Sequence, residues 1–263
     1  MTQSTPVLAK IDGKTGVATI TFNRPEVLNA IDVATATAFL EAVRLVTADS
    51  TVRCIILSGE GRAFVAGGDV ASFAVDLSKA GAIVDRLLDA IHPAILALRS
   101  SPAPVVAAVR GAAAGAGLSL VLGADYVVAA DDARFLIAYD KIGASPDCGG
   151  TWFLPRRVGR SRAFELMLLG ATIDAKTALE YGVVNVVVPA ADLDMRAGEV
   201  AARIASGPTG AYGAFKALVD SEMPLAQHLE AERMAFIKAT HSLDFRAGVS
   251  AFIGKHKPQF TGR

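Results

Sequence analysis

Short, mainly apolar runs recur along the chain, and helical patterns separate them. Such runs span residues 52–57, 105–109, 126–129 and 183–188. An apolar run of this length, bounded by turn residues, is typical of a strand that is buried on both faces. Buried strands that alternate with helices predict an α/β core. Beyond Pro189 the pattern is helical only, so we expect a helical region to follow the core.

The first strands are predicted to form a hairpin, because residues 7–11 and 17–22 flank an Asp-Gly turn. Asp32 is a good N-cap, and a helix is expected from there to about Thr47. Residues 135–138 are expected to form a further strand. Other helices are predicted over residues 82–98, 162–169 and 175–181.

Composition excludes several classes of protein. Of the 263 residues, 52% are hydrophobic and 20% are charged, which is unlike a disordered or fibrous chain. Lys and Arg total 26, as do Asp and Glu, so no overall field attracts nucleic acid or a membrane surface. The two cysteines, Cys54 and Cys148, offer no disulfide framework or zinc spacing and suit a reducing compartment. With no secretory signal in "MTQSTPVLAKID", we expect a cytoplasmic protein.

The most apolar stretch, residues 105–130, is too short to cross a membrane. Arg110 and Asp125 interrupt it, and the residues between them include four glycines. We interpret it as the interior of the core.

Common catalytic motifs are incomplete. "GAGLSL" lacks the third glycine of a dinucleotide-binding loop, and no phosphate-binding loop is present. Ser119 lies outside a nucleophile elbow. The four histidines have no paired ligand spacing, so we expect no metal site.

Two glycine-rich loops each lead from a buried strand into a helix. In "AFVAGGDV", the backbone N–H of Gly68 is open to close approach, and Asp69 can cap the next helix. In "GAAAGAGLSL", the N–H of Ala116 would lie at a helix N-terminus. Two such N–H groups that converge would form an oxyanion hole. The same glycines would equally allow tight packing of strand on helix, and either loop alone leaves both interpretations open.

Asp147 lies in "SPDCGG", which by itself is turn chemistry. Pro146 fixes φ, and the glycine pair after Cys148 tolerates positive φ. A turn-forming role and an acid–base role are therefore both open from this segment alone.

Several segments together resemble the crotonase (enoyl-CoA hydratase/isomerase) superfamily over about residues 7–260. They are "ITFNRPEVLNAI", "FVAGGDV", "GAAAGAG", "VGRSRAFELMLLGATIDAKTALEYGVVNVVVP" and "FIGKHKPQF". The resemblance implies a ClpP-like spiral of ββα units over residues 1–195 and a helical trimerisation region over 196–263. It also implies a CoA thioester as substrate, no other cofactor, a homotrimer or hexamer, and neither a nucleic-acid nor a membrane partner.

The resemblance assigns roles to individual residues. The amides of Gly68 and Ala116 would hold the thioester oxygen. Tyr139 would lie in the substrate site. The residues expected to contact CoA are Glu26, Val27, Leu28 and Ala66, together with Phe252 and Lys255 from a neighbouring subunit.

The chain departs from a hydratase at both glutamate positions of the family, where it has Ser119 and Tyr139. Neither side chain is a good base near neutral pH. Asp147 instead aligns with the aspartate of certain isomerases and of the aromatic dehalogenases. "SPDCGGTWFLPR" looks most like the ring-opening epoxyphenylacetyl-CoA isomerase branch. Trp152 and Phe153 are expected to help form an apolar acyl pocket.

One carboxylate is sufficient to move a double bond, because the group that removes an α-proton can return a proton at the γ-carbon. We therefore expect an enoyl-CoA isomerase, with Asp147 as the catalytic acid–base group. Three alternatives remain: a hydratase with non-standard acid–base groups, a non-catalytic acyl-CoA-binding or RNA-associated family member, and nucleophilic attack by Asp147 on a halogenated aryl-CoA. The balanced charge argues against RNA.

Overall fold

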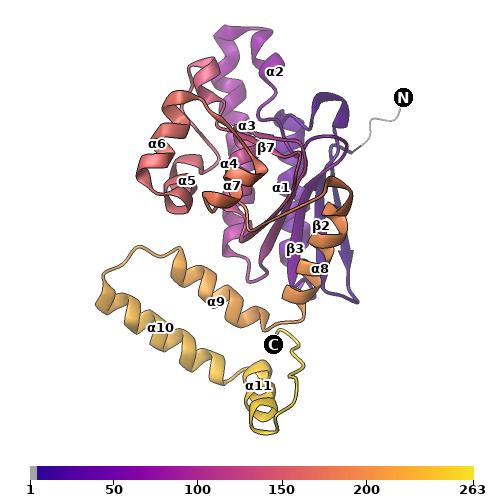
Figure 1. Cartoon of the computed structure of the whole chain (residues 1–263), viewed down its shortest axis with the longest axis vertical. Helices are drawn as coiled ribbons and strands as arrows, with labels where there is room; N and C mark the ends of the chain where they lie inside the picture. Colours follow the sequence, from indigo (N-terminus) through magenta and orange to yellow (C-terminus); the bar gives the residue numbers. More distant parts are fainter. Residues whose placement is uncertain (1–4) are drawn as a thin grey trace.

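A six-stranded sheet forms the centre of the protein, with the strand order β1–β2–β3–β4–β6–β9 (Figure 1). The structure is a computed structural model that describes residues 5–263. Residues 1–4, which belong to the N-terminal stretch considered above and to the predicted core, lie outside the described residues. The strands are β1 (Val7–Asp12), β2 (Val17–Phe22), β3 (Cys54–Gly59), β4 (Val105–Val109), β6 (Tyr126–Ala130) and β9 (Val186–Val188). β1 and β2 form the predicted antiparallel hairpin, and all other neighbours are parallel.

A second sheet contains three short strands, β5 (Ala112–Ala114), β7 (Arg134–Leu136) and β8 (Thr172–Asp174). β4 leads into β5 and then into helix α4 (Ala116–Gly123), and β1–β2 lead in the same way into α1 (Val33–Ala48). The chain therefore winds through successive ββα units. This arrangement confirms the α/β class and the spiral that the resemblance implies.

Both faces of the main sheet are covered, which explains the continuous apolar runs. Side chains alternate between the faces along β4. Val106 and Ala108 pack with helix α8 (Leu193–Ala205), whereas Val105 and Val109 belong to the larger core on the opposite face. Every residue of β4 is therefore buried.

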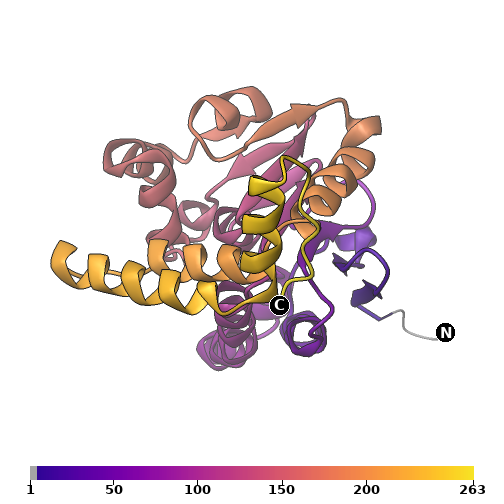
Figure 2. The ribbon, with the colours of Figure 1, turned by 90° about the horizontal axis from the view of Figure 1, so that it is seen from below.

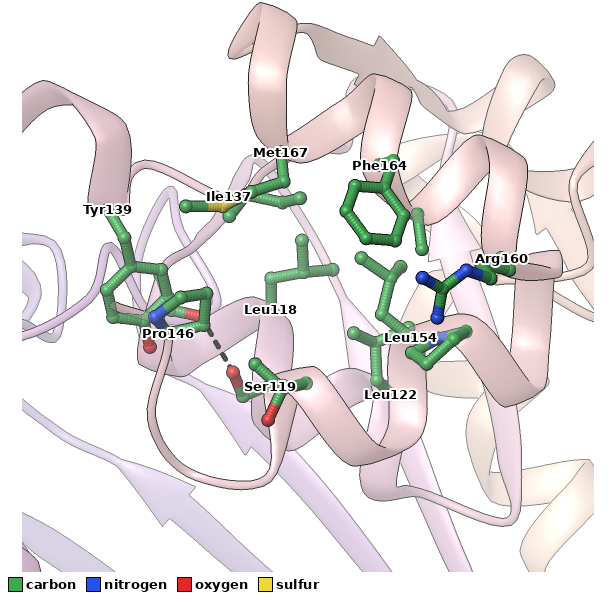
Figure 3. Close-up of a pocket in the computed structure, with 15 residues that line it drawn as sticks. Leu118, Ser119, Leu122, Ile137, Tyr139, Pro146, Leu154, Arg160, Phe164 and Met167 are labelled. Carbon is green, nitrogen blue, oxygen red and sulfur yellow. Dashed lines mark hydrogen bonds between the residues drawn. The ribbon is translucent and has the colours of Figure 1, made fainter. Parts of the chain in front are cut away.

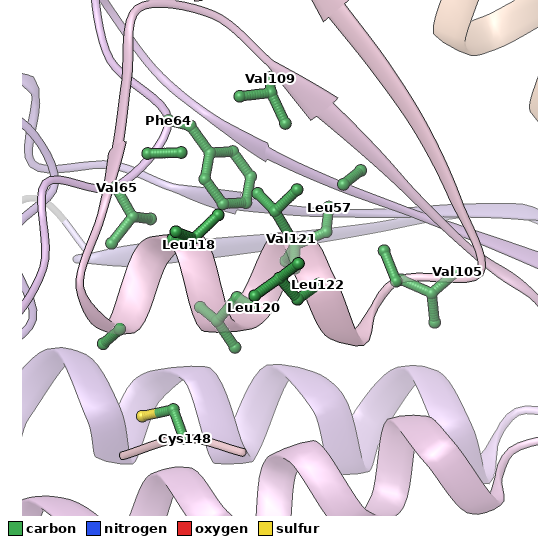
Figure 4. Packing of buried hydrophobic residues seen from close by; sticks show 14 of the residues in the cluster. Leu57, Phe64, Val65, Val105, Val109, Leu118, Leu120, Val121, Leu122 and Cys148 are labelled. Carbon is green, nitrogen blue, oxygen red and sulfur yellow. The ribbon is translucent and has the colours of Figure 1, made fainter. Parts of the chain in front are cut away.

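Helix α4 lies within the larger core, where its leucines and valine pack below β3 and β4 (Figure 4). Residues 116–122 of this helix are all buried. The apolar stretch over residues 105–130 is thus interior, as expected. In the part of the chain that the structure describes, no helix is long and apolar enough to cross a membrane.

The remaining helices of the core surround these sheets. They are α2 (Val70–Ala74), α3 (Ala80–Ser100), α5 (Gly150–Val158), α6 (Arg160–Leu169) and α7 (Ala175–Glu180), with short 3₁₀ turns η1 (Pro25–Val27), η2 (Leu77–Lys79), η3 (Tyr139–Ile142) and η4 (Ala190–Asp192). The Asp32 carboxylate accepts a hydrogen bond from the amide of Thr35, which confirms the predicted cap of α1.

Three helices extend from the α/β layers as a C-terminal arm (Figures 1 and 2). They are α9 (Thr209–Val219), α10 (Leu225–Thr240) and α11 (Leu243–Ile253). The predicted boundary between residues 195 and 196 falls inside α8, which packs on β3, β4 and β6. The arm that leaves the core therefore begins at α9.

The strand predicted over residues 135–138 is shorter than expected. β7 ends at Leu136, and Ala138 has a φ of 67°. A left-handed residue cannot continue a strand. The chain turns there into η3, which positions Tyr139.

Candidate active site

The two glycine-rich loops lie against each other. Val65 forms a parallel bridge with Ala113 of β5, and the Ala114 amide donates to the Val65 carbonyl at 3.0 Å. A Cβ atom added to Gly115 would lie 3.7 Å from the Cα of Gly67. The structure therefore brings together the segments that carry Gly68 and Ala116.

The N–H groups of Gly68 and Ala116 are both available to a ligand. Ile31 bonds to the residues on either side of Gly68: its amide donates to Gly67, and its carbonyl accepts from Asp69, each at 2.8 Å. In this parallel pairing, the N–H of Gly68 therefore points away from Ile31. Ala116 is the first residue of α4, where helix amides have no intrahelical acceptor. Within residues 5–263, neither amide has a hydrogen-bond acceptor.

Two glycines in the second loop are required, one by its backbone conformation and the other by a close contact. Gly115 has φ 51° and ψ −120°, a conformation that suits glycine. At Gly117, an added Cβ would lie only 2.0 Å from the Val65 carbonyl oxygen. This loop therefore serves both of the roles left open by the sequence. Gly117 allows tight packing, and Ala116 presents an amide that is free among the described residues.

The loop that contains Glu26, Val27 and Leu28 lies beside the first glycine-rich loop. The Ala66 amide donates to the Leu28 carbonyl at 3.1 Å. The buried Asn29 side chain donates to the carbonyls of Ala63 and Phe64 and so fixes the two loops together. Glu26 and Val27 remain exposed.

Asp147 is held next to the second glycine-rich loop by two hydroxyl groups. The Tyr139 hydroxyl donates a short hydrogen bond to Oδ1 of Asp147. The buried Ser119 hydroxyl lies 3.0 Å from the backbone carbonyl of Asp147 and 3.3 Å from that of Gly115. The two residues at the family's glutamate positions thus contact Asp147.

Burial determines the protonation of the neighbouring groups. It raises the pKa of the Tyr139 hydroxyl far above its usual value, and the negative charge of Asp147 raises that pKa further. The pKa of the buried Cys148 thiol is raised by the same two causes. Both groups therefore stay protonated near neutral pH, and Asp147 is the member of this cluster suited to accept a proton.

An apolar cavity of about 330 Å³ opens beside this cluster (Figure 3), a volume typical of small-molecule sites. It runs between α4, η3, α5 and α6. Tyr139 and Pro146 lie at one end, and Arg160 and Phe164 lie at the other. Its lining residues are Gly115, Leu118, Ser119, Leu122, Ile137, Tyr139, Pro146, Gly150, Thr151, Leu154, Pro155, Arg160, Ala163, Phe164 and Met167.

The prediction that Trp152 and Phe153 line this cavity is wrong. Residues 150–158 form α5, and the helical period turns Thr151 and Leu154 toward the cavity. Trp152 and Phe153 face a separate cavity between α5 and α9. The sequence analysis did not predict α5, so it could not show that Trp152 and Phe153 face a different cavity from Thr151 and Leu154.

The expected cap by Asp69 is also wrong. Its side chain makes no capping hydrogen bond to α2. The carboxylate lies 3.4 Å from the guanidinium of Arg24. It therefore connects the first glycine-rich loop to the loop that contains Glu26.

Phe252 and Lys255 do not line the cavity within one chain. Phe252 is 87% exposed on α11, in the C-terminal arm (Figure 1). Their predicted contact with CoA depends on a neighbouring subunit and stays a prediction. Among the described residues, no cluster of three His, Cys, Asp or Glu side chains could hold a metal.

Known proteins are similar to this chain in both fold and sequence. An enoyl-CoA hydratase from Polaromonas sp. JS666 has a crystal structure that matches 97% of this chain and 99% of its own, with a TM-score of 0.90 and 34% identity. The fold is thus that of the crotonase class. The profile of the Enoyl-CoA hydratase/isomerase family matches residues 12–263, and the chain belongs to that family.

Two similar relatives are isomerases. The 1,2-epoxyphenylacetyl-CoA isomerase of Escherichia coli (strain K12) is 42% identical over 254 residues, which cover 94% of this chain and 96% of the relative. The trans-2-decenoyl-[acyl-carrier-protein] isomerase of Streptococcus mutans is 34% identical and covers 98% of each chain. A probable enoyl-CoA hydratase of Rhodobacter capsulatus is 40% identical over 94% of this chain and 95% of its own. The family resemblance predicted from the sequence is confirmed.

Proposed function

We propose that this protein is an enoyl-CoA isomerase that acts on an acyl-CoA thioester, with Asp147 as its acid–base group. The observation that carries the proposal is the position of Asp147. Its carboxylate accepts a hydrogen bond from Tyr139, which lines one end of the apolar cavity and stands where a hydratase has its second glutamate. The isomerases among the relatives support the same assignment.

In the proposed reaction, the Asp147 carboxylate removes the α-proton of a β,γ-enoyl thioester. The electron pair moves onto the thioester oxygen, which the amides of Gly68 and Ala116 stabilise as a dienolate. The dienolate then takes the proton back from Asp147 at its γ-carbon, which gives the α,β-enoyl product and restores the carboxylate. No water is consumed. The same groups would serve an isomerisation that opens an epoxide or oxepin ring.

The CoA portion would lie along Glu26, Val27, Leu28 and Ala66, with Phe252 and Lys255 supplied by a second subunit of a homotrimer or hexamer. The loops that contain the first four residues are fixed together by Asn29. CoA enters as part of the substrate, and no further cofactor takes part.

The test compares Asp147→Asn with Asp140→Asn. Asp140 lies seven residues before Asp147, and its partly exposed carboxylate pairs with Lys141. With a β,γ-enoyl-CoA in deuterium oxide, Asp147→Asn should lose α-proton exchange and isomerisation by about 10²–10⁴-fold, the usual contribution of a positioned acid–base group. Binding of the ester should survive, and Asp140→Asn should behave as the unmodified protein. Full turnover by Asp147→Asn would remove this residue from the mechanism.

A hydratase is the second candidate, because several relatives carry that name. Crotonyl-CoA in ¹⁸O-labelled water separates the two functions. Incorporation of the label would favour hydration, whereas double-bond migration without incorporation supports the isomerase. Ester binding without either reaction would instead indicate a non-catalytic binding protein.

A further inference from the structure

One charged side chain, that of the exposed Arg160, is among the residues that line this largely apolar cavity. Arg160 lies across the cavity from Tyr139 and Pro146, with its guanidinium directed toward the lining residues (Figure 3). The walls between these two ends are formed by aliphatic side chains such as Leu118, Leu154 and Met167. An acyl group bound with its thioester near Ala116 would extend along these walls toward Arg160.

The guanidinium of Arg160 is available, unlike those of its neighbours. Arg156 pairs with Glu222, and Arg157 donates to the carbonyls of Leu122 and Ala124. Within residues 5–263, Arg160 has no carboxylate at ion-pair distance, and its guanidinium carbon lies 4.9 Å from the centre of the Phe164 ring. The aromatic ring supports the planar group while leaving its N–H donors unused.

From this arrangement we infer that Arg160 is a specificity-determining residue that recognises a carboxylate at the far end of the acyl chain. This inference rests on the proposed function, since it deepens the substrate class of the same site. Arg160 is exposed, so a carboxylate at this end of the cavity would meet a cation that has no ionic partner among residues 5–263. Arginine offers two parallel N–H groups that match the two carboxylate oxygens. The substrate class is therefore an ω-carboxy enoyl-CoA.

The experiment uses pairs of β,γ-enoyl-CoA esters with six, eight and ten acyl carbons. One member of each pair ends in a methyl group and the other in a carboxylate. Dissociation constants are measured by calorimetry and kcat/KM by absorbance, for the full-length protein, for Arg160→Gln and for Arg162→Gln. Arg162 is the matched control, because it belongs to the same helix but stacks on Tyr181 and does not line the cavity.

At the chain length that spans the cavity, the unmodified protein should prefer the ω-carboxy ester. Arg160→Gln should weaken binding and kcat/KM for that ester by about fivefold, the upper range for an ion pair that stays exposed to solvent. Its effect on the methyl-terminated ester should be within about twofold, and Arg162→Gln should change neither. Equal losses for both esters, or no preference in the unmodified protein, would overturn the inference.

The binding measurement separates this inference from the proposed function. If the esters bind with the expected Arg160-dependent preference but do not isomerise, the proposed function fails and the subsite stands. If the methyl-terminated ester isomerises and Arg160→Gln changes nothing, the function stands and the subsite fails.

Discussion

At the scale of single residues, Tyr139 is as informative as Asp147. Its hydroxyl is buried, protonated and bonded to one oxygen of the Asp147 carboxylate. Tyr139 also lines the cavity. It occupies a hydratase glutamate position, and its hydrogen bond to Asp147 would position the proposed acid–base group.

Replacing Tyr139 by Phe removes this hydrogen bond and keeps the ring that lines the cavity. The expected result is a fall in kcat of about 10- to 100-fold with little change in KM, because a hydrogen bond to a charged group is lost while the apolar contacts remain. Steady-state kinetics with a β,γ-enoyl-CoA provide the measurement. A change confined to KM would instead assign Tyr139 to substrate binding alone.

Substitution by alanine should destabilise the protein at Gly117 but not at Gly68. In Gly117→Ala, the Cβ would lie 2.0 Å from the Val65 carbonyl oxygen, so α4 must move away from the first glycine-rich loop. We expect a loss of about 1–3 kcal/mol in the free energy of unfolding, measured with urea. Gly68→Ala is the control, because its Cβ would meet only the Phe73 ring at 3.4 Å. Equal stability of the two variants would contradict this account.

At the scale of elements, a buried group of charges attaches the C-terminal arm to the core. Lys216 on α9 is 5% exposed and lies 2.9 Å from Asp125, which also accepts from Arg99. The Lys216 ammonium donates to the carbonyls of Leu98 and Ala103. Burial lowers the pKa of Lys216, and the charge of Asp125 opposes that shift.

Lys216→Ala should therefore destabilise the protein by about 3 kcal/mol, because it leaves buried acceptors without their donor. Lys79→Ala should cost less than about 1 kcal/mol, since the Lys79 side chain is 74% exposed in its pair with Asp76. Urea unfolding of both variants gives the comparison. If the two losses are equal, α9 is held by its apolar contacts instead of by these charges.

The sequence predicts elements well where one local signal dominates. β4 and the start of α1 are as expected, because continuous burial and the Asp32 cap leave clear patterns. Helix α5 was missed, since Gly149–Gly150 and Pro155 are typical turn residues. The orientation of its faces, and with it the lining of the cavity, depends on packing against α4 that no local pattern records.

The residues of the candidate site also differ in whether the sequence alone predicts them. Asp147 and the two loop amides could be proposed from motifs, because their geometry depends on glycines and a helix start. The contact of Tyr139 and Ser119 with Asp147 joins segments distant in sequence and needed the fold. Arg160 was not singled out, because nothing in its local sequence distinguishes it from the arginines beside it.

At the scale of the whole molecule, the C-terminal arm exposes many large apolar side chains. They include Leu225, Leu229, Met234, Phe236, Ile237, Leu243, Phe252 and Ile253. Apolar surface of this extent is typical of a face that binds another protein. It is consistent with the predicted association of identical chains.

Light scattering after size exclusion should therefore give three or six times the chain mass of 27.2 kDa. Replacing Phe252 and Ile253, which are 87% and 75% exposed, by Asp should lower this mass while leaving the folded α/β core intact by circular dichroism. A monomer at micromolar concentration in the unmodified protein would rule out the predicted assembly.

The hydroxyl of Ser119 bonds to the very peptide that bears Asp147, and Ser119 belongs to the helix whose first amide is that of Ala116. The side chain of Ser119 thereby connects the proposed acid–base group with the helix that supplies a proposed oxyanion donor. A substitution at Ser119 should therefore disturb both groups together.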